Sequence, residues 1–203
     1  MSQPQVARPD PGNEAASASV PVSGPASGAR AKPTSAARTS LSRIMSSLDT
    51  NLLGTVHGGV IMKLVDDVAG AVAARHSGGN AVTASMDEMV FLVPVRVGDL
   101  VHAHAQVNWA GRTSMEVGVR VVAERWDQTG VPPTHVASAY LAFVAVDSGG
   151  RPRPVPPVAP ETDDDRRRYH EAEIRRRHRL AQRAAIRASR EAKGGADGSG
   201  AGE

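Results

Sequence analysis

The sequence predicts an α+β domain in which an antiparallel sheet curls around one long helix. Two observations support this prediction. Residues His57 to His76 repeat their apolar side chains at helical spacing, and most of the chain from residue 81 to residue 147 alternates with period two. A single helix followed by a run of strands is typical of a sheet that buries one face against that helix.

The composition divides the 203 residues into four parts. Residues 1–40 are rich in Ala, Ser, Pro, Gly and Thr and bury little apolar surface, so we expect a disordered tail. Residues 41–160 are expected to form the folded domain. Residues 161–190 predict a charged helix, and residues 191–203, which end in KGGADGSGAGE, predict a second flexible tail.

Charge and composition argue against several classes of function. Residues 41–160 hold nine Lys or Arg and ten Asp or Glu, whereas residues 161–190 hold ten Arg and six acids. The basic excess therefore belongs to one helix, which makes a nucleic-acid surface on the domain an unfavoured interpretation. With no cysteine there is no disulfide and no Cys nucleophile. We expect a cytosolic protein, because no stretch has the length of a membrane span and the N-terminus lacks the apolar core of a signal peptide.

The expected elements follow one another closely. A short strand is possible at 39–48, then DTNLLGT is a loop, and HSGGN ends the helix with glycines that allow a left-handed cap. Four strands come next, joined at NWAGRT and DQTGVPP by hairpin connections. They are expected at 81–95, 99–107, 113–124 and 135–147.

The stretch NLLGTVHGGVIMKLVDD, residues 51–67, allows two interpretations. On a helical wheel Asp66 and Asp67 lie opposite the main apolar stripe, and a water-facing side is the simpler explanation. However, small and apolar residues surround Asp66, and a glycine at position 70 suits the close approach of another backbone. Gly58 and Gly59 leave amides accessible at the helix start, where an oxyanion can bind, although tight packing also explains glycine there.

DTNLLGTVHGGVIMKLVDDVAGAVAARH resembles the signature of the hotdog-fold acyl-CoA thioesterases, the bacterial and brain-type acyl-CoA hydrolases. The shared pieces are N-x-x-G-x-x-x-G-G, an aspartate on the helix and R-H near its end. GRTSMEVGVRV and RRRYHEAEIRRR are also similar to the family's later strand and Arg-rich extension. The resemblance implies a five-stranded antiparallel sheet around a central helix. It also implies a homodimer with sites at its interface, assembling further into a trimer of dimers.

The resemblance also implies roles for particular residues. Asn51 and Asp66 match the catalytic pair, and Asp67 is a supporting or solvated carboxylate. The carbonyl oxygen would lie near His57, Gly58 and Gly59, with His57 more suited to loop packing than to acting as a base. The candidates for CoA contacts are Arg75, His76, Arg112, Thr113 and Ser114, with helix-cap and hairpin roles as the alternatives.

The predicted reaction is hydrolysis of an acyl-CoA thioester, with Asp66 as general base or as nucleophile and Asn51 from the opposing chain. No metal and no cofactor is expected; His102 and His104 alternate on one strand face without a third ligand. Three alternatives remain. The chain is a hotdog module that binds acyl-CoA without cleaving it, a hydratase or dehydratase, or a protein that binds nucleic acid or an acidic partner through its Arg-rich helix.

Overall fold

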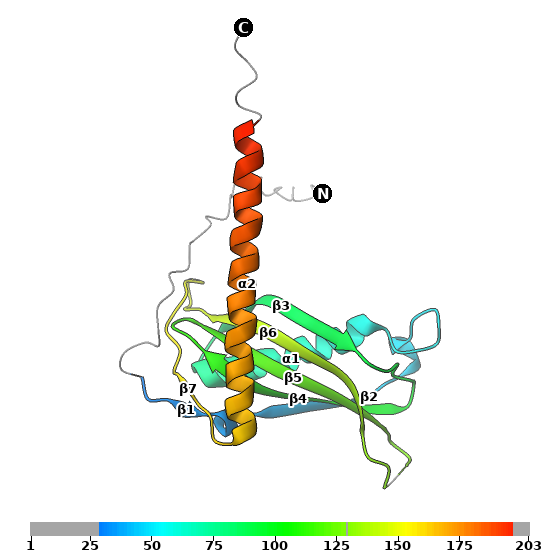
Figure 1. Ribbon diagram of the computed structural model, residues 1–203. Helices are drawn as coiled ribbons and strands as arrows, with labels where there is room; N and C mark the ends of the chain where they lie inside the picture. Colours follow the sequence, from blue (N-terminus) through cyan, green and yellow to red (C-terminus); the bar gives the residue numbers. More distant parts are fainter. Residues whose placement is uncertain (1–28, 129, 197–203) are drawn as a thin grey trace, which may run out of the picture.

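The computed structural model describes residues 29–128 and 130–196. Its centre is a five-stranded sheet in the order β2-β4-β5-β6-β3, with every neighbouring pair antiparallel. The sheet curls around helix α1, Gly58–Ser77 (Figure 1), so the predicted α+β hotdog architecture is confirmed. The strands are β2 Thr39–Ile44, β3 Ala81–Phe91, β4 Asp99–Ala110, β5 Ser114–Arg125 and β6 Thr134–Ala145.

Helix α1 is held at both ends by the residues that limit it. The His57 side chain accepts a hydrogen bond from the Gly59 N–H at the start, and Gly78 adopts φ 73° at the end, as the glycine-rich HSGGN predicted. The buried face is wider than the predicted stripe and is rotated from it, because the curled sheet encloses the helix on more than one side. The buried side chains are those of Ile61, Leu64, Val65, Val68, Ala69, Val72, Ala73, His76 and Ser77.

The period-two patterns of the strands decide which face each residue occupies. Val101, Ala103, Ala105 and Val107 on β4 are buried against α1, together with the alternate residues Met115 to Val121 on β5. The opposite, convex face carries polar side chains such as those of Gln106 and Glu116, which are nevertheless buried. A second helix covers them.

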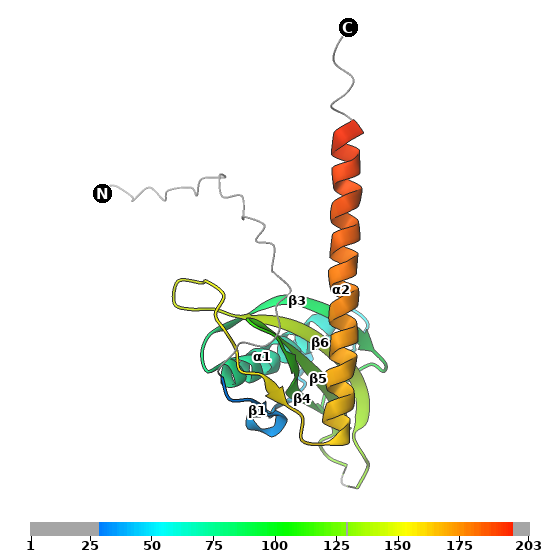
Figure 2. The same ribbon diagram turned by 60° about the vertical axis from the view of Figure 1, so that its left-hand side comes forward.

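That second helix is α2, Asp163–Ala196, which lies on the opposite side of the sheet from α1 (Figure 2). It contacts Gln106 on β4 through Asp165, Glu116 on β5 through Arg175, and β3 through an ion pair between Arg179 and Asp87. The helix begins two residues later and ends six residues later than the predicted span of 161–190. Residues 197–203 of the predicted flexible tail lie outside the described residues.

The N-terminal segment is ordered further upstream than predicted. Residues 1–28 lie outside the described part of the chain, but strand β1, Lys32–Pro33, pairs in parallel with β7, Val158–Ala159, and a short 3-10 helix η1, Thr34–Ala36, follows it. The Lys32 ammonium donates to the backbone carbonyl of His76 at 2.8 Å. The predicted disordered tail of 1–40 is therefore wrong for residues 32–40, because polar contacts across the fold hold a segment that has few apolar residues.

In the part of the chain that the structure describes, neither helix is long and apolar enough to cross a membrane.

Candidate functional site

The loop before α1 is fixed by a buried aspartate. Asp49, at the end of the 3-10 helix η2, Ser47–Asp49, accepts hydrogen bonds from the backbone N–H and hydroxyl of Ser46 and from Arg43 at 2.6 Å. The hydrogen bonds from Ser46 and the Arg43 charge lower the pKa of Asp49 below its ordinary value. The backbone carbonyl of Asp49 accepts from the His57 N–H at 2.7 Å, so the residue that the carboxylate fixes in place also holds the residue before α1.

Asn51 closes the tip of this loop with its side chain. Its Oδ1 accepts from the Leu53 N–H at 2.8 Å, and its Nδ2 donates to the Thr55 hydroxyl at 2.9 Å. Leu52 and Leu53, beside it, are almost fully exposed. Two leucines at an exposed loop tip suit contact with another apolar surface.

The start of α1 offers one free amide, not two. The Gly59 N–H donates to His57 Nδ1 at 2.9 Å, which assigns His57 to helix capping. The Gly58 N–H donates to no acceptor among the described residues. The expectation that both glycines present open amides therefore needs correction: the first-turn donor left for an oxyanion is Gly58.

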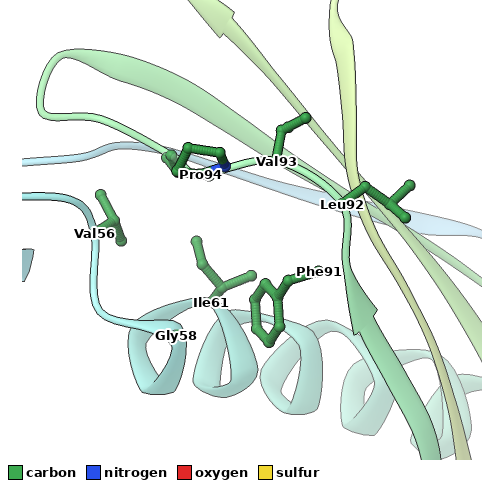
Figure 3. Close-up of a pocket in the computed structure, with 8 residues that line it drawn as sticks. Val56, Gly58, Ile61, Phe91, Leu92, Val93 and Pro94 are labelled. Atoms are coloured by element: carbon green, nitrogen blue, oxygen red, sulfur yellow. The ribbon is translucent and has the colours of Figure 1, made fainter.

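An apolar cavity of about 300 Å³ opens beside that amide (Figure 3). Val56, Gly58 and Ile61 form one wall, and the end of β3 with the segment after it, residues 91–95, forms the other. A Cβ on Gly58 would lie 3.5 Å from the Phe91 ring, so a larger residue would narrow the space between helix and strand. Figure 3 shows Phe91 lying against the first turns of α1. The cavity is suited to hydrocarbon next to a polar group held by Gly58.

The two helix aspartates have different surroundings. Asp67 forms an ion pair with Lys63 one turn earlier, at 2.8 Å. Asp66 accepts a hydrogen bond from the Thr83 hydroxyl of β3, also at 2.8 Å. Both carboxylates are exposed in the single chain. Only Asp66 is therefore oriented by the sheet, and it lies beside the edge strand.

Thr83 was not among the residues that the sequence singled out. Its own neighbourhood, AVTASM, carries no motif, and only the packing of β3 beside α1 brings it to Asp66. The sequence signal that could have identified Thr83 is that it is a polar residue on the face of β3 that lies against α1.

At the other end of α1, His76 requires a correction. Its ring is 1% exposed and its Nε2 lies 2.9 Å from the carbonyl oxygen of Pro156; burial lowers its pKa. A side chain held this way fastens the 146–160 segment to the helix and is not available for a CoA phosphate. Arg75 is exposed and donates to the Thr39 hydroxyl at 2.6 Å.

Arg112, Thr113 and Ser114 lie at the turn between β4 and β5. The carbonyls of Arg112 and Thr113 accept hydrogen bonds from the Val155 and Ala145 N–H groups, both at 2.9 Å, while the Arg112 side chain is exposed. Val146, the residue after Ala145 at the end of β6, donates its N–H to the carbonyl of Asn80, which lies just after α1. The hairpin therefore sits near the end of α1, about 30 Å along the helix from Gly58.

The candidates thus fall into separate groups along α1. Asn51, His57, Gly58 and Gly59 lie at its start, Asp66 lies two turns in, and Arg75 and the hairpin lie near its end. One chain alone does not bring these groups together. The strand beside Asp66, β3, is one of the two edges of the sheet, bordered by the exposed apolar side chains of Met62, Val82 and Val90.

The histidines of β4 lie on the other face of the sheet. His102 and His104 stack with ring centroids 6.0 Å apart and contact the hydroxyls of Ser42 and Ser40 at 2.7 Å. Burial and the charge of His102 lower the pKa of His104. Among the described residues, no group of three or more His, Cys, Asp or Glu side chains is arranged to hold a metal ion.

Comparison with known proteins identifies the family. Residues 53–127 match the model of the thioesterase superfamily. The chain is 43% identical over 141 residues to an uncharacterised acyl-CoA thioester hydrolase of Bacillus subtilis, covering 66% of this chain and 81% of that protein. The chain belongs to the acyl-CoA thioester hydrolase family. It also matches the cytosolic acyl coenzyme A thioester hydrolase of Mus musculus, at 38% identity, but spans only 36% of that relative's length.

Solved structures of acyl-CoA thioester hydrolases have the same fold. The Staphylococcus aureus acyl-CoA hydrolase, solved with butyryl coenzyme A and coenzyme A, is 35% identical with a TM-score of 0.73 over 80% of this chain and 98% of that one. A hexameric acyl-CoA thioesterase is 36% identical with a TM-score of 0.73, over 76% of this chain and 98% of that one.

Single-alanine variants of the Staphylococcus aureus hydrolase have also been solved. They replace one asparagine, one aspartate and one threonine, and the aspartate follows the asparagine by fifteen residues and precedes the threonine by seventeen. Asn51, Asp66 and Thr83 have the same two spacings.

Proposed function

We propose that this protein hydrolyses acyl-CoA thioesters to the free acid and CoA. The observation that carries the proposal is the Asp66 carboxylate, held by Thr83 on the helix whose start offers the Gly58 amide beside an apolar cavity. The family to which the chain belongs, and the matching spacing of Asn51, Asp66 and Thr83, support it.

We propose further that the site is shared between two copies. Pairing of β3 with the β3 of a second copy about a two-fold axis extends the sheet and sets the two α1 helices antiparallel. The start of one helix, with its Asn51 loop, then lies beside the later part of the other. This arrangement covers Met62, Val82 and Val90, and it joins the groups that one chain keeps apart. The hexameric state of one structural neighbour supports it.

Each step follows from the chemistry of these groups. The thioester carbonyl oxygen binds at the Gly58 amide, and a donor of this kind contributes about 2.7–4 kcal/mol to the transition state in other hydrolases. Asp66 takes a proton from a water molecule, whose oxygen attacks the carbonyl carbon. The partner subunit's Asn51 orients that water or the carbonyl. The C–S bond then breaks, and CoA leaves as the thiolate and takes up a proton.

The CoA moiety is assigned to the far end of the helix. Arg75 and Arg112 are exposed cations there, and Thr113 and Ser114 supply hydroxyls in the same hairpin. Because thiolate is a good leaving group, we propose no cofactor beyond the CoA thioester itself. The name of the murine relative supports a cytosolic location.

The deciding experiment compares Asp66→Asn with Asp67→Asn. We expect Asp66→Asn to lower kcat for lauroyl-CoA at least a hundredfold, because an amide cannot accept the proton from water. Asp67→Asn should lower kcat less than about threefold, because its charge-paired partner is Lys63 and it does not touch Thr83. Thiol release measures turnover, and molar mass in solution checks that both variants assemble as the parent protein does.

Undiminished turnover in Asp66→Asn contradicts the proposal, and equal losses in both variants transfer the role of base to Asp67. A parent protein that binds lauroyl-CoA without releasing thiol would instead be an acyl-CoA-binding module.

A further inference from the structure

Helix α2 contacts the sheet through one row of residues at spacings of three and four. Asp165 binds Gln106, Ala172 is fully buried, Arg175 binds Glu116 and stacks on Tyr140, and Arg179 pairs with Asp87 of the edge strand β3. Spacings of three and four keep residues on one face of a helix. This row defines the sheet-facing side of α2 across the whole convex face.

The same row continues after the sheet has ended. Figures 1 and 2 both show α2 passing β3 and projecting well beyond it, and the projecting part, residues 180–196, is about 25 Å long. Arg183, Ile186 and Arg190 continue the spacing on the sheet-facing side. Every side chain from Leu180 to Glu191 is exposed, and Ile186 is 45% exposed.

The projecting end has exposed side chains on every side from Leu180 to Glu191, whereas most helical stability in proteins comes from packing of one face. The direction of the projection indicates what covers it. It extends from the β3 side of the sheet, where a second copy would continue the sheet beyond β3. The convex face of that copy would then lie directly beneath Arg183, Ile186 and Arg190.

We propose that residues 180–191 of α2 pack on the convex face of a second copy of this chain and strap the two subunits together. The proposal rests on the two-fold pairing of β3 in the proposed function. It assigns the Arg-rich end of the helix to self-association and not to nucleic acid or an acidic protein.

One acid of α2 suits this arrangement. A two-fold axis at β3 places the two α2 helices antiparallel, so the arginines at the end of one lie alongside the first half of the other. That half, residues 163–179, holds seven arginines and five acids, and Asp163, Asp164 and Glu171 are already paired with arginines of their own helix. The acid left for an arginine of the second subunit is Glu173. The Glu173 carboxylate is 45% exposed and lies 3.9 Å from His170, so it is accessible to an arginine from the second subunit.

The test uses the full chain and two matched substitutions. Ile186→Asp places a charge in the proposed contact, and Ala188→Asp places the same charge about 160° away on the helix. We expect Ile186→Asp to raise the dimer dissociation constant at least tenfold and Ala188→Asp to leave it unchanged, measured by molar mass across a dilution series. At concentrations that restore the dimer, kcat for lauroyl-CoA in Ile186→Asp should equal that of the parent.

Hydrogen exchange supplies an independent readout. In the parent protein, the amides of residues 180–191 should become protected as the dimer forms. A dimer with fast exchange in this segment and no effect of Ile186→Asp overturns the strap and leaves the proposed function standing. Protection that appears only when dimers join into a larger assembly also overturns it. A parent chain that stays monomeric contradicts the shared site itself.

Discussion

Thr83 illustrates how much one hydroxyl contributes to the candidate site. It donates to the Asp66 carboxylate at 2.8 Å from the edge strand, while Asp67 is paired with a lysine on its own helix. A hydrogen bond to a charged group contributes about 1.5–3 kcal/mol. In the proposed mechanism Thr83 positions the base, so its removal should cost less than removal of the carboxylate.

Replacing Thr83 with Val tests this at nearly constant volume. We expect kcat for lauroyl-CoA to fall at least about tenfold with KM little changed. The lower end of the range for this hydrogen bond, about 1.5 kcal/mol, corresponds to roughly a tenfold change in rate. Thr83→Ser keeps the hydroxyl and should restore at least half of the parent's kcat. Equal losses in the valine and serine variants would show that the methyl group, not the hydrogen bond, is what matters.

At this scale the sequence predicted some residues and not others. Asn51, Asp66 and Gly58 belong to one contiguous motif, so the sequence could single them out as candidates, and their roles stay predictions. Thr83 acts from another element, and His57 Nδ1 occupies the Gly59 amide through a rotamer that no sequence pattern specifies. His76 was misassigned because a histidine at a helix end has the same sequence appearance whether it faces solvent or, as here, the Pro156 carbonyl.

Among the elements, α2 depends on the network around its first turn. Asp165 is 2% exposed and accepts hydrogen bonds from Thr34 at 2.7 Å, from Gln106 at 3.1 Å and from Arg38 at 3.3 Å. Burial acts to raise the pKa of Asp165, but the hydrogen bonds from Thr34, Gln106 and Thr162 outweigh it and lower that pKa from 3.8 to about 2. The N-terminal segment, β4 and α2 thus meet at one carboxylate.

Because the folded-state pKa is below the unfolded value, this carboxylate stabilises the fold above about pH 4 and the contribution is lost as pH falls through 2. We expect Asp165→Asn to lower the free energy of unfolding by about 2 kcal/mol at pH 6, with the difference from the parent shrinking toward pH 2. Urea unfolding across this pH range measures it. A difference that stays constant with pH would mean that the ionised form is not the one the network stabilises.

The order of the main elements was predictable because each has its own period. Helix α1 has a period near 3.6 and the four long strands a period near two, and both patterns extend over enough residues to be distinctive. Strand β1 was missed for the opposite reason. Two residues cannot show a period, and Lys32–Pro33 is ordered by its pairing with β7, which lies more than a hundred residues later.

At the scale of the whole molecule, the proposed assembly depends on the β3 edge of the sheet. Backbone groups of β3 and the exposed side chains of Val82 and Val90 lie along one border, next to Asp66. An apolar edge of this kind is suited to pairing with another strand. The sequence alone did not show which strand forms this edge, because strand order is set by long-range pairing.

A charge on this edge should separate the subunits and abolish turnover together. We expect Val90→Asp to yield a monomer at micromolar concentration and to lower turnover of lauroyl-CoA at least a hundredfold, since burying an unpaired carboxylate costs several kcal/mol. Val131→Asp, on the exposed loop between β5 and β6, is the matched control and should change neither property. An active monomer of Val90→Asp would show that one chain suffices for catalysis.

The order of strands in the sheet also determines which segment can be excised as a unit. The stretch that matches the superfamily model, residues 53–127, includes α1, β3, β4 and β5 but omits β2 and β6. Strand β6 lies between β5 and β3, so a fragment cut to those limits would leave β3 without a neighbour and α1 with part of its wall missing. The shortest fragment that keeps every strand pairing described here runs from Lys32 to Ala159, and one that also keeps the contacts of α2 with the sheet continues to Arg179.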